Sequence, residues 1–405
     1  MNSVREQLGS CSRADQLVDE LIGFAEFGQV SLRSEIGGTP AFTNEFWTSK
    51  QRAAHSLHEV SYRACFKPQL PRFFIERLTS PGDLVYDPFM GRGTTLVEAA
   101  LLGREVAGCD VNPLSRVLTA PRLAPPSLDH VRQRLDMIDL EPTGEIREDL
   151  TVFYHPSTLR KITGLRDYLR QVRRARTGDT VDDWIRLVAT NRLTGHSSGF
   201  FSVYTLPPNQ AVSIQSQRRI NAQRNQTPPN RDICSLILKK SKQLLSDPAR
   251  PANCLTPLLL TQTCETTPQL GDNSVSLVVT SPPFLDTVDY AQDNWLRAWF
   301  CDIDLETVPI LHLRKPEDWK VAMARVFREL HRVIRPNGFI AFEVGEVRNG
   351  TVRLEEQVLE SGKAAGLTPV LILINAQEFT KTANCWGIAN NRKGTNTNRV
   401  VLFTK

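Results

Sequence analysis

The chain has 405 residues, a formal net charge of +5 and a sequence pI near 8.8. This length can hold one large domain with an insertion or two domains, and the mild positive charge suits a polyanionic partner without requiring one. Eight scattered cysteines without a C-x-x-C pair disfavour a zinc site and a disulfide framework, and no apolar run approaches the length of a membrane span. Composition therefore favours a metal-free protein of a reducing cytoplasm.

Residues 1–45 are expected to form an N-terminal appendage. Leu17, Leu21 and Phe24 recur at a helical spacing, and a stretch containing Gly and Ser follows them. We interpret this region as a packing element in preference to a DNA-contacting arm.

A strand, a glycine turn and a helix are predicted between residues 84 and 103. Gly91 and Gly93 allow backbone conformations and a close ligand approach that a Cβ would obstruct. A second strand follows and ends in Asp110, about twenty positions after the turn, where a carboxylate can bind ribose hydroxyls. The turn lacks the full dinucleotide fingerprint, which disfavours a nicotinamide cofactor.

Residues 123–255 differ in pattern from their surroundings. Prolines mark a break before them, and helices are predicted at 128–138, 157–176, 182–193 and 233–245. The arginine-rich second helix is as typical of a solvated face as of a binding face. The segment 215–231 is rich in Gln, Asn and Arg, whose paired donors and acceptors match base edges in a major groove.

The C-terminal part alternates strands with helices. Strands are predicted at 258–264, 276–281, 339–344, 368–375 and 399–404, and helices at 319–334 and 354–365. Alternation at these lengths predicts an α/β fold with a doubly wound, mostly parallel sheet.

Two motifs carry a resemblance to a known family. Asp87-Pro-Phe-Met-Gly-Arg-Gly-Thr-Thr95 resembles the S-adenosylmethionine turn of the amino-methylating DNA methyltransferases, D-P-F-x-G-x-G-T-T, and Ser281-Pro-Pro-Phe284 resembles their catalytic tetrapeptide. Each motif follows an apolar strand. The resemblance implies a Rossmann-like methyltransferase domain at 46–122 and 256–405, with a mostly helical target-recognition region inserted at 123–255.

The resemblance also implies how S-adenosylmethionine would be bound as the cofactor. Phe66 and Pro68 are similar to an aromatic-Pro pair that covers the methionine end, and Asp110 with Asn112 is similar to a D-x-N-P segment that meets the ribose. Asp110 also suits a helix N-cap, and both roles can hold together. Gln262-Thr-Cys264 stands where the family often has an acidic adenine contact. The turn itself would contribute Asp87, Pro88, Phe89, Gly91, Gly93, Thr94 and Thr95.

In the family's chemistry, hydrogen bonds that accept both amino protons of a base restore the nitrogen lone pair. The resemblance gives this role to the Ser281 side chain and the Pro282 carbonyl, while Pro283 stiffens the turn and Phe284 stacks on a flipped-out base. Serine at the first position goes mainly with cytosine, which favours N4-cytosine over N6-adenine methylation. An RNA methyltransferase and a catalytically silent DNA-binding protein are the rival interpretations.

The expected partner is double-stranded DNA, with a separate restriction endonuclease of a restriction-modification system compatible with the sequence. We interpret the insertion as the target-recognition region in preference to a structural insertion, because a sequence-specific methyltransferase needs such a region. The candidate phosphate or guanine contacts are Arg218, Arg219, Arg224 and Arg231.

Overall fold

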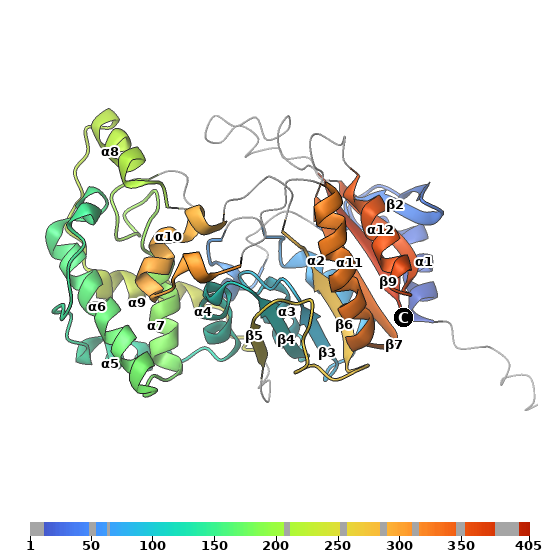
Figure 1. Ribbon diagram of the computed structural model, residues 1–405, viewed down its shortest axis with the longest axis horizontal. Coiled ribbons are helices and arrows are strands. Elements are labelled where there is room, and N and C mark those ends of the chain that lie inside the picture. Colours follow the sequence, from blue (N-terminus) through green and yellow to red (C-terminus); the bar gives the residue numbers. More distant parts are fainter. Residues whose placement is uncertain are drawn as a thin grey trace, which may run out of the picture.

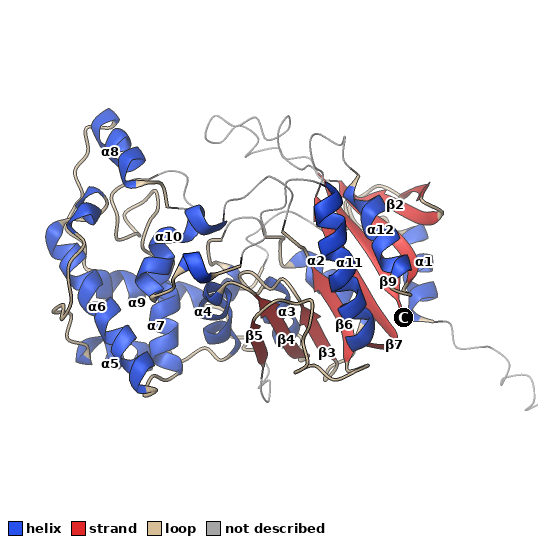
Figure 2. Cartoon of the chain, in the orientation of Figure 1, coloured by secondary structure: helices blue, strands red, loops and turns tan. Residues whose placement is uncertain are grey.

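The computed structural model describes residues 12–47, 54–62, 65–205, 211–251, 257–283, 290–309, 316–345, 353–376 and 397–405. A helical region and a sheet covered by helices lie side by side along the long axis of the molecule (Figures 1 and 2). Within the described residues, every helix is too short or too polar to span a lipid bilayer.

The sheet contains nine described strands in the order β1-β2-β8-β9-β7-β6-β3-β4-β5. From β3 the chain moves outward through β4 to β5, and it returns beside β3 as β6 before moving the other way. Ligands bind outside the carboxyl ends of strands at such a reversal. The predicted doubly wound α/β fold is confirmed. The strands of this core are β3 (Leu84–Asp87), β4 (Glu105–Asp110), β5 (Leu258–Thr261), β6 (Val275–Thr280), β7 (Ile334–Gly345), β8 (Thr368–Ala376) and β9 (Thr397–Thr404).

Alternate residues along the strands face two separate apolar cores. Val85 and Val279 pack toward one face, whereas Tyr86 and Val278 pack toward the other. This two-sided burial is expected of a mainly parallel sheet, in which β9 alone of the core strands runs antiparallel to its neighbours. The first face is covered by α2 (Gln69–Leu78), α3 (Thr94–Leu101) and α4 (Pro113–Leu123), and the second by α11 (Pro316–Val333) and α12 (Leu354–Ala364).

The N-terminal segment contributes more to the sheet than its sequence pattern indicates. After α1 (Arg13–Gly23), the strands β1 (Leu32–Ile36) and β2 (Thr39–Asn44) form a hairpin, and β2 pairs in parallel with β8. The sequence pattern predicts no strand here, and it indicates only an appendage at residues 1–45. The outer strand β1 is almost wholly exposed, so it lacks the alternation of buried residues that signals a strand.

The helical region consists mainly of residues from the predicted insertion. The predicted helices occur within two or three residues of their expected bounds, whereas α8 was not predicted. A further helix, α10, comes from beyond the Ser-Pro-Pro turn and packs on α4, α6 and α7. The helices are α5 (Leu128–Met137), α6 (Pro156–Ala175), α7 (Thr180–Thr190), α8 (Ile214–Gln223), α9 (Ile233–Leu244) and α10 (Tyr290–Cys301), with short 3₁₀ turns at Ser56–His58, Glu148–Val152 and Leu305–Thr307.

The arginine run of α6 has a structural partner at the end of α10. Arg166, Arg170 and Arg173 lie 3.7, 3.3 and 3.0 Å from the carboxylate of Asp302. The guanidinium of Arg166 also lies over the ring of Trp299, 5.2 Å from its centroid. These three arginines therefore tie α6 to α10.

Candidate active site

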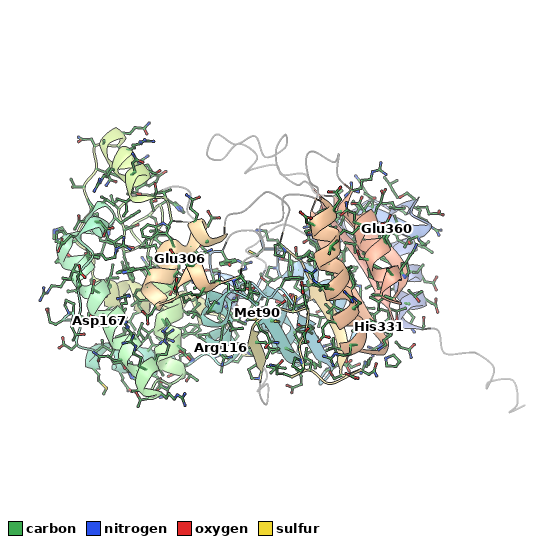
Figure 3. The ribbon with its side chains drawn as sticks, viewed as in Figure 1. Met90, Arg116, Asp167, Glu306, His331 and Glu360 are labelled. Carbon is green, nitrogen blue, oxygen red and sulfur yellow. The ribbon has the colours of Figure 1, made fainter. Side chains whose placement is uncertain are left out.

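The glycine turn is shaped by two left-handed residues. Gly91 and Gly93 have φ values of 49° and 74°, and Gly93 is the N-cap of α3. A Cβ at Gly93 would lie 2.3 Å from Oγ1 of Thr119, so α4 leaves no room for a side chain there. Figure 3 labels Met90 in this turn, at the middle of the molecule in that view. The sequence thus folds into a sharp bend between β3 and α3.

Asp110, at the end of β4, closes against the glycine turn. Its carboxylate accepts hydrogen bonds from the backbone N–H of Gly91 at 2.9 Å and of Asn112 at 2.8 Å. Burial raises the pKa of Asp110. The N-cap of α4 is Asn112, whose side chain accepts from the N–H of Leu114 at 3.0 Å. The capping role therefore belongs to Asn112, which leaves Asp110 to line the site.

Hydrogen bonds join the two sequence motifs. Thr280, the last residue of β6, donates from its hydroxyl to Asp87 at 2.6 Å, and the hydroxyl of Thr95 donates to the carbonyl of Val279 at 3.0 Å. Burial raises the pKa of Asp87 to about 7. Asp87 and Thr95 therefore hold the Ser-Pro-Pro turn beside the glycine turn.

The Ser-Pro-Pro turn is also anchored on its other side. The carbonyl of Pro283 accepts a hydrogen bond from the indole nitrogen of Trp319, a buried residue of α11, at 3.2 Å. Phe284, the expected stacking residue, lies outside the described residues.

Residues from both motifs line one cavity at the carboxyl ends of β3, β4 and β6. An adjoining smaller hollow shares Tyr62, Phe89, Gly91 and Ser281 with it. Ser281 therefore lies where the two spaces meet. The main cavity is lined by Tyr62, Pro88, Phe89, Gly91, Asp110, Val111, Asn112, Gln262, Thr263, Cys264, Glu265, Ser281, Pro282, Pro283, Pro309, Met323 and Val326.

The other predicted cofactor residues have different positions. Phe66 and Thr94 line the smaller hollow together with Asp87. Pro68 lines neither space and is the N-cap of α2. Gly93 and Thr95 belong to the turn but line neither of the two spaces. Sequence reasoning missed Tyr62 because it contacts the turn only through the tertiary fold.

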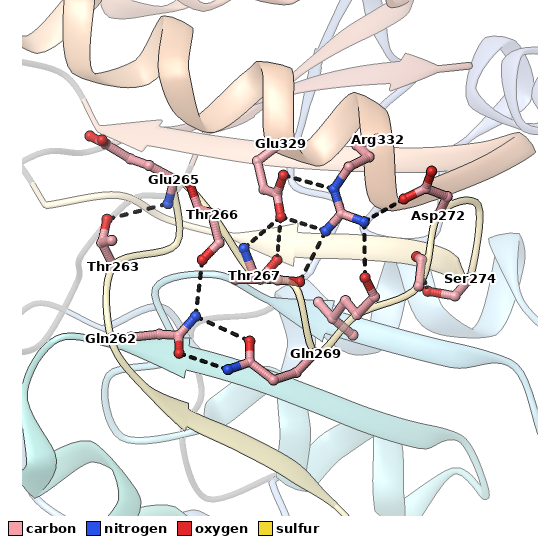
Figure 4. Close-up of polar contacts among 12 residues, drawn as sticks. Gln262, Thr263, Glu265, Thr266, Thr267, Gln269, Asp272, Ser274, Glu329 and Arg332 are labelled. Carbon is pink, nitrogen blue, oxygen red and sulfur yellow. Dashed lines mark hydrogen bonds and ion pairs between the residues drawn. The ribbon is translucent and has the colours of Figure 1, made fainter.

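The loop between β5 and β6 forms one wall of the cavity (Figure 4). Thr267 donates from both its N–H and its hydroxyl to Glu329 of α11, each at 2.6 Å, and Arg332 also binds Glu329. Burial would raise the pKa of Glu329, but hydrogen bonds from Arg332 and Thr267 outweigh it and lower the pKa to about 2. The side chain of Gln262 is paired with Gln269 at 3.1 and 3.2 Å. The wall is therefore fixed to α11.

Glu265 supplies a carboxylate to this wall that sequence analysis did not single out. It lines the cavity and lies 2.9 Å from the guanidinium of Arg325. Gln262-Thr-Cys264, the segment that departs from the family pattern, lines the same wall. Glu265 follows it directly and supplies an acidic group there.

Buried basic groups hold the segment before the turn in place. Arg92, which lines the smaller hollow, donates to the carbonyl of Val60 at 2.8 Å, and Arg122 donates to that of Leu57 at 3.1 Å. His58 bonds to Glu98 at 2.7 Å, and burial lowers the pKa of His58 to about 4. No group of three metal-ligating side chains occurs among the residues that the structure describes.

The predicted DNA-contacting arginines lie in the helical region and not at the cavity. Arg218 and Arg219 are exposed on α8, and the guanidinium of Arg224 lies 3.8 Å from the ring centroid of Tyr204. Arg231 is partly buried, and its backbone N–H donates to the hydroxyl of Thr158 at 2.8 Å. Figure 1 shows α8 projecting at the outer end of the helical region.

Comparison with known proteins finds similarity to DNA methylases in part of the chain. Residues 33–115 match the model of the N6- and N4-methylating DNA methylases. This part of the chain is therefore similar to the DNA amino-methyltransferases. The chain is 34% identical over 142 residues to the Type II methyltransferase M.MvaI of Kocuria varians, which covers 34% of this chain and 27% of the relative. It is 20% identical over 302 residues to M.BsoBI of Geobacillus stearothermophilus, which covers 66% of this chain and 57% of the relative.

The matched segment contains the glycine turn and Asp110 but ends before Ser281. The chain spans less than two thirds of either relative. Among solved structures, the chain is similar to a geranyl diphosphate C-methyltransferase from Streptomyces coelicolor A3(2), at 8% identity and a TM-score of 0.33, covering 83% of this chain and 79% of that one. A TM-score this low carries no argument about function.

Proposed function

We propose that the chain transfers a methyl group from S-adenosylmethionine to the N4 amino group of a cytosine flipped out of duplex DNA. One observation supports this proposal most strongly. The glycine turn and the Ser-Pro-Pro turn line one cavity, and Ser281 lies where that cavity meets a second hollow. A site for a methyl donor and a site for a base are both needed, and they must meet at the transferred group.

The residues of the turn fit S-adenosylmethionine. The Nδ2 of Asn112 is buried without a hydrogen-bond partner among the described residues, and both Asn112 and Asp110 line the cavity. Asp110 would hold the ribose, and the left-handed glycines leave the backbone open to the ligand. When bound, S-adenosylmethionine supplies a sulfonium methyl group with its own leaving group.

The protein's contribution to transfer is to position and polarise the base. The lone pair of an exocyclic amino group is delocalised into the ring, which makes the nitrogen a poor nucleophile. The Ser281 hydroxyl and the Pro282 carbonyl would accept hydrogen bonds from the two N–H groups of this amino group and partly restore that lone pair. Trp319 fixes the turn through the Pro283 carbonyl, so these two acceptors keep their directions without reorganisation.

Cytosine is favoured as the base because serine occupies the first position of the catalytic tetrapeptide. N6-adenine methylation uses the same fold and chemistry and is the alternative. The relatives are named Type II methyltransferases, which supports duplex DNA as the substrate and a restriction-modification system as the setting.

Helix α8 has the features of a DNA-contacting element. Gln217 and Asn221 face inward and donate to the carbonyls of Tyr204 at 3.0 Å and Val152 at 2.7 Å. These amides therefore anchor the helix and are not free to read bases. The opposite face is exposed at helical spacing and carries two positive charges that suit a major groove or a phosphate backbone. Its residues are Gln215, Arg218, Arg219 and Ala222.

Ser281→Ala tests the catalytic assignment. Methyl transfer from labelled S-adenosylmethionine is measured with duplex DNA, with RNA and without nucleic acid. The wild type should incorporate label into duplex DNA alone. The variant should lose transfer by about 100-fold or more, in the range that follows loss of one preorganised hydrogen-bonding group, while its dissociation constant for S-adenosylmethionine changes little. Incorporation into RNA alone, or equal loss of transfer and cofactor affinity, would contradict the proposal.

A further inference from the structure

A buried carboxylate lies beside Ser281 and has no place in the scheme above. Glu343 is 2% exposed and belongs to β7, directly after Phe342, which pairs with Thr280 of β6. The register of this parallel pair therefore places Glu343 next to Ser281. The Ser281 hydroxyl lies within hydrogen-bonding reach of the Glu343 carboxylate. Asn398 of β9 donates its Nδ2–H to the same carboxylate at 2.9 Å.

Ser281, Glu343 and Asn398 each lie at the end of a row of apolar side chains on one face of the sheet. On one face of the sheet, Leu277 and Val279 of β6 precede Ser281, and Phe339 and Ala341 of β7 precede Glu343. On β9, Asn398 is followed on the same face by Val400 and Leu402. Each of these rows becomes polar only at the edge of the sheet that carries the cavity, so the polar side chains lie beside the site.

A carboxylate buried in a sheet is costly unless its partners compensate it. Burial raises the pKa of Glu343, and the hydrogen bonds from Ser281 and Asn398 oppose that effect. The neighbouring positions Phe342 and Val344 are buried and apolar. An apolar side chain at 343 would satisfy packing at lower cost, so the carboxylate points to a role exerted through Ser281.

We propose that Glu343 is a positioning residue that accepts a hydrogen bond from the Ser281 hydroxyl and so turns the lone pairs of Oγ toward the base. A serine hydroxyl has one donor and two acceptor sites, and its proton rotates to the best available acceptor. With Glu343 as that acceptor, Oγ is left to accept the amino proton of the base. Without it, the hydroxyl is free to direct its own proton at the base, which would oppose the reaction.

This inference rests on the proposed function, since it assigns Ser281 as the acceptor of an amino proton. It adds that the acceptor is oriented by a residue that does not touch the base. Glu343→Leu removes the acceptor at similar size, whereas Glu343→Gln keeps an oxygen that can accept from Ser281. Asn398→Leu is the matched control, because it removes the other partner of the same carboxylate and leaves the bond to Ser281.

The test is the single-turnover rate of methyl transfer at saturating cofactor and DNA. We expect Glu343→Leu to lower the rate by about 100-fold, Glu343→Gln by about tenfold or less, and Asn398→Leu by less than Glu343→Leu. Affinity for S-adenosylmethionine should change by less than about threefold, and unfolding curves should show that each variant is folded.

A double-mutant cycle with Ser281→Ala separates positioning from a general structural effect. If Glu343 acts through Ser281, Glu343→Leu should lower the residual rate of the Ser281→Ala variant by less than about twofold. Equal fold losses in both backgrounds, or an unchanged rate in Glu343→Leu, would overturn the inference. A wild-type chain that transfers no methyl group to DNA would instead overturn the proposed function, and this inference with it.

Discussion

The substitution Gly93→Ala tests whether the cofactor turn depends on a residue without a side chain. Gly93 has φ +74°, and left-handed backbone costs a non-glycine residue about 1–2 kcal/mol. The added Cβ would also lie 2.3 and 2.5 Å from Oγ1 and Cγ2 of Thr119, and overpacking of this kind costs about 1–3 kcal/mol. Together these contributions predict a loss of about 2–5 kcal/mol in the free energy of unfolding.

Two further variants separate strain from overpacking. At Gly91, with φ +49°, an added Cβ would meet its nearest atoms only at 3.8 and 3.9 Å, so Gly91→Ala should show the backbone cost of about 1–2 kcal/mol alone. Thr119→Ala removes the two closest atoms, and its Oγ1 is buried without a hydrogen-bond partner among the described residues. The cost of Gly93→Ala should therefore fall in the Thr119→Ala background, where the two shortest contacts are gone and the nearest remaining contact is at 2.9 Å, to the Cβ of residue 119.

Urea unfolding of the four proteins and of the Gly93→Ala/Thr119→Ala double variant gives these free energies directly. The reasoning is refuted if Gly93→Ala costs no more than Gly91→Ala, or if its cost is the same with threonine and with alanine at position 119. Gly91→Ala should instead weaken S-adenosylmethionine binding, because its Cβ would enter the cavity that Gly91 lines.

Three other predictions follow from the same contacts. The pKa of Asp87 is raised by burial to about 7 from 3.8, so between these values the folded state keeps a proton that the unfolded state has lost. The stability of the wild type relative to Asp87→Asn should therefore fall by about 4 kcal/mol as pH rises through this window, and parallel pH profiles of unfolding would contradict the assignment. Asp110→Ala removes the acceptor of two backbone N–H groups and should weaken S-adenosylmethionine binding by about 10- to 100-fold. Its effect on turnover at saturating cofactor should be smaller. Calorimetry measures the first loss and steady-state kinetics the second, and equal losses would contradict this role. The double variant Arg218→Ala/Arg219→Ala should weaken DNA binding and reduce its salt dependence. The control Arg132→Ala, on α5 and far from α8 in Figure 1, should change neither. Equal effects of the two variants would show that α8 does not contact DNA.

The local parts of the site could be predicted from the sequence because each of them is formed by consecutive residues. The glycine turn, Asp110 and the Ser-Pro-Pro turn each follow a strand, and parallel strands bring their carboxyl ends together. The fold class followed from the alternation of apolar strands and helices. Asp110 and Asn112 could not be separated by sequence, since either side chain can cap a helix and only the geometry gives that role to Asn112.

The remaining parts depend on partners that are distant along the chain. Glu343 lies 62 positions from Ser281, and no motif links the two. The arginines of α6 were equally compatible with binding and with a solvated face until Asp302 was found against them. Helix α8 was missed because its inward face is built from amides such as Gln217 and Asn221, so it has no apolar periodicity.

The central claim is the transfer of a methyl group to cytosine N4 in duplex DNA. Its most direct test is methylome sequencing of a host that lacks methyltransferases of its own and expresses this chain, read by a method that separates N4-methylcytosine from N6-methyladenine. We expect N4-methylcytosine at a short recurrent motif, and we expect it to be absent when the Ser281→Ala variant is expressed. N6-methyladenine at such a motif would contradict the choice of base, and an unmodified genome would contradict the activity itself.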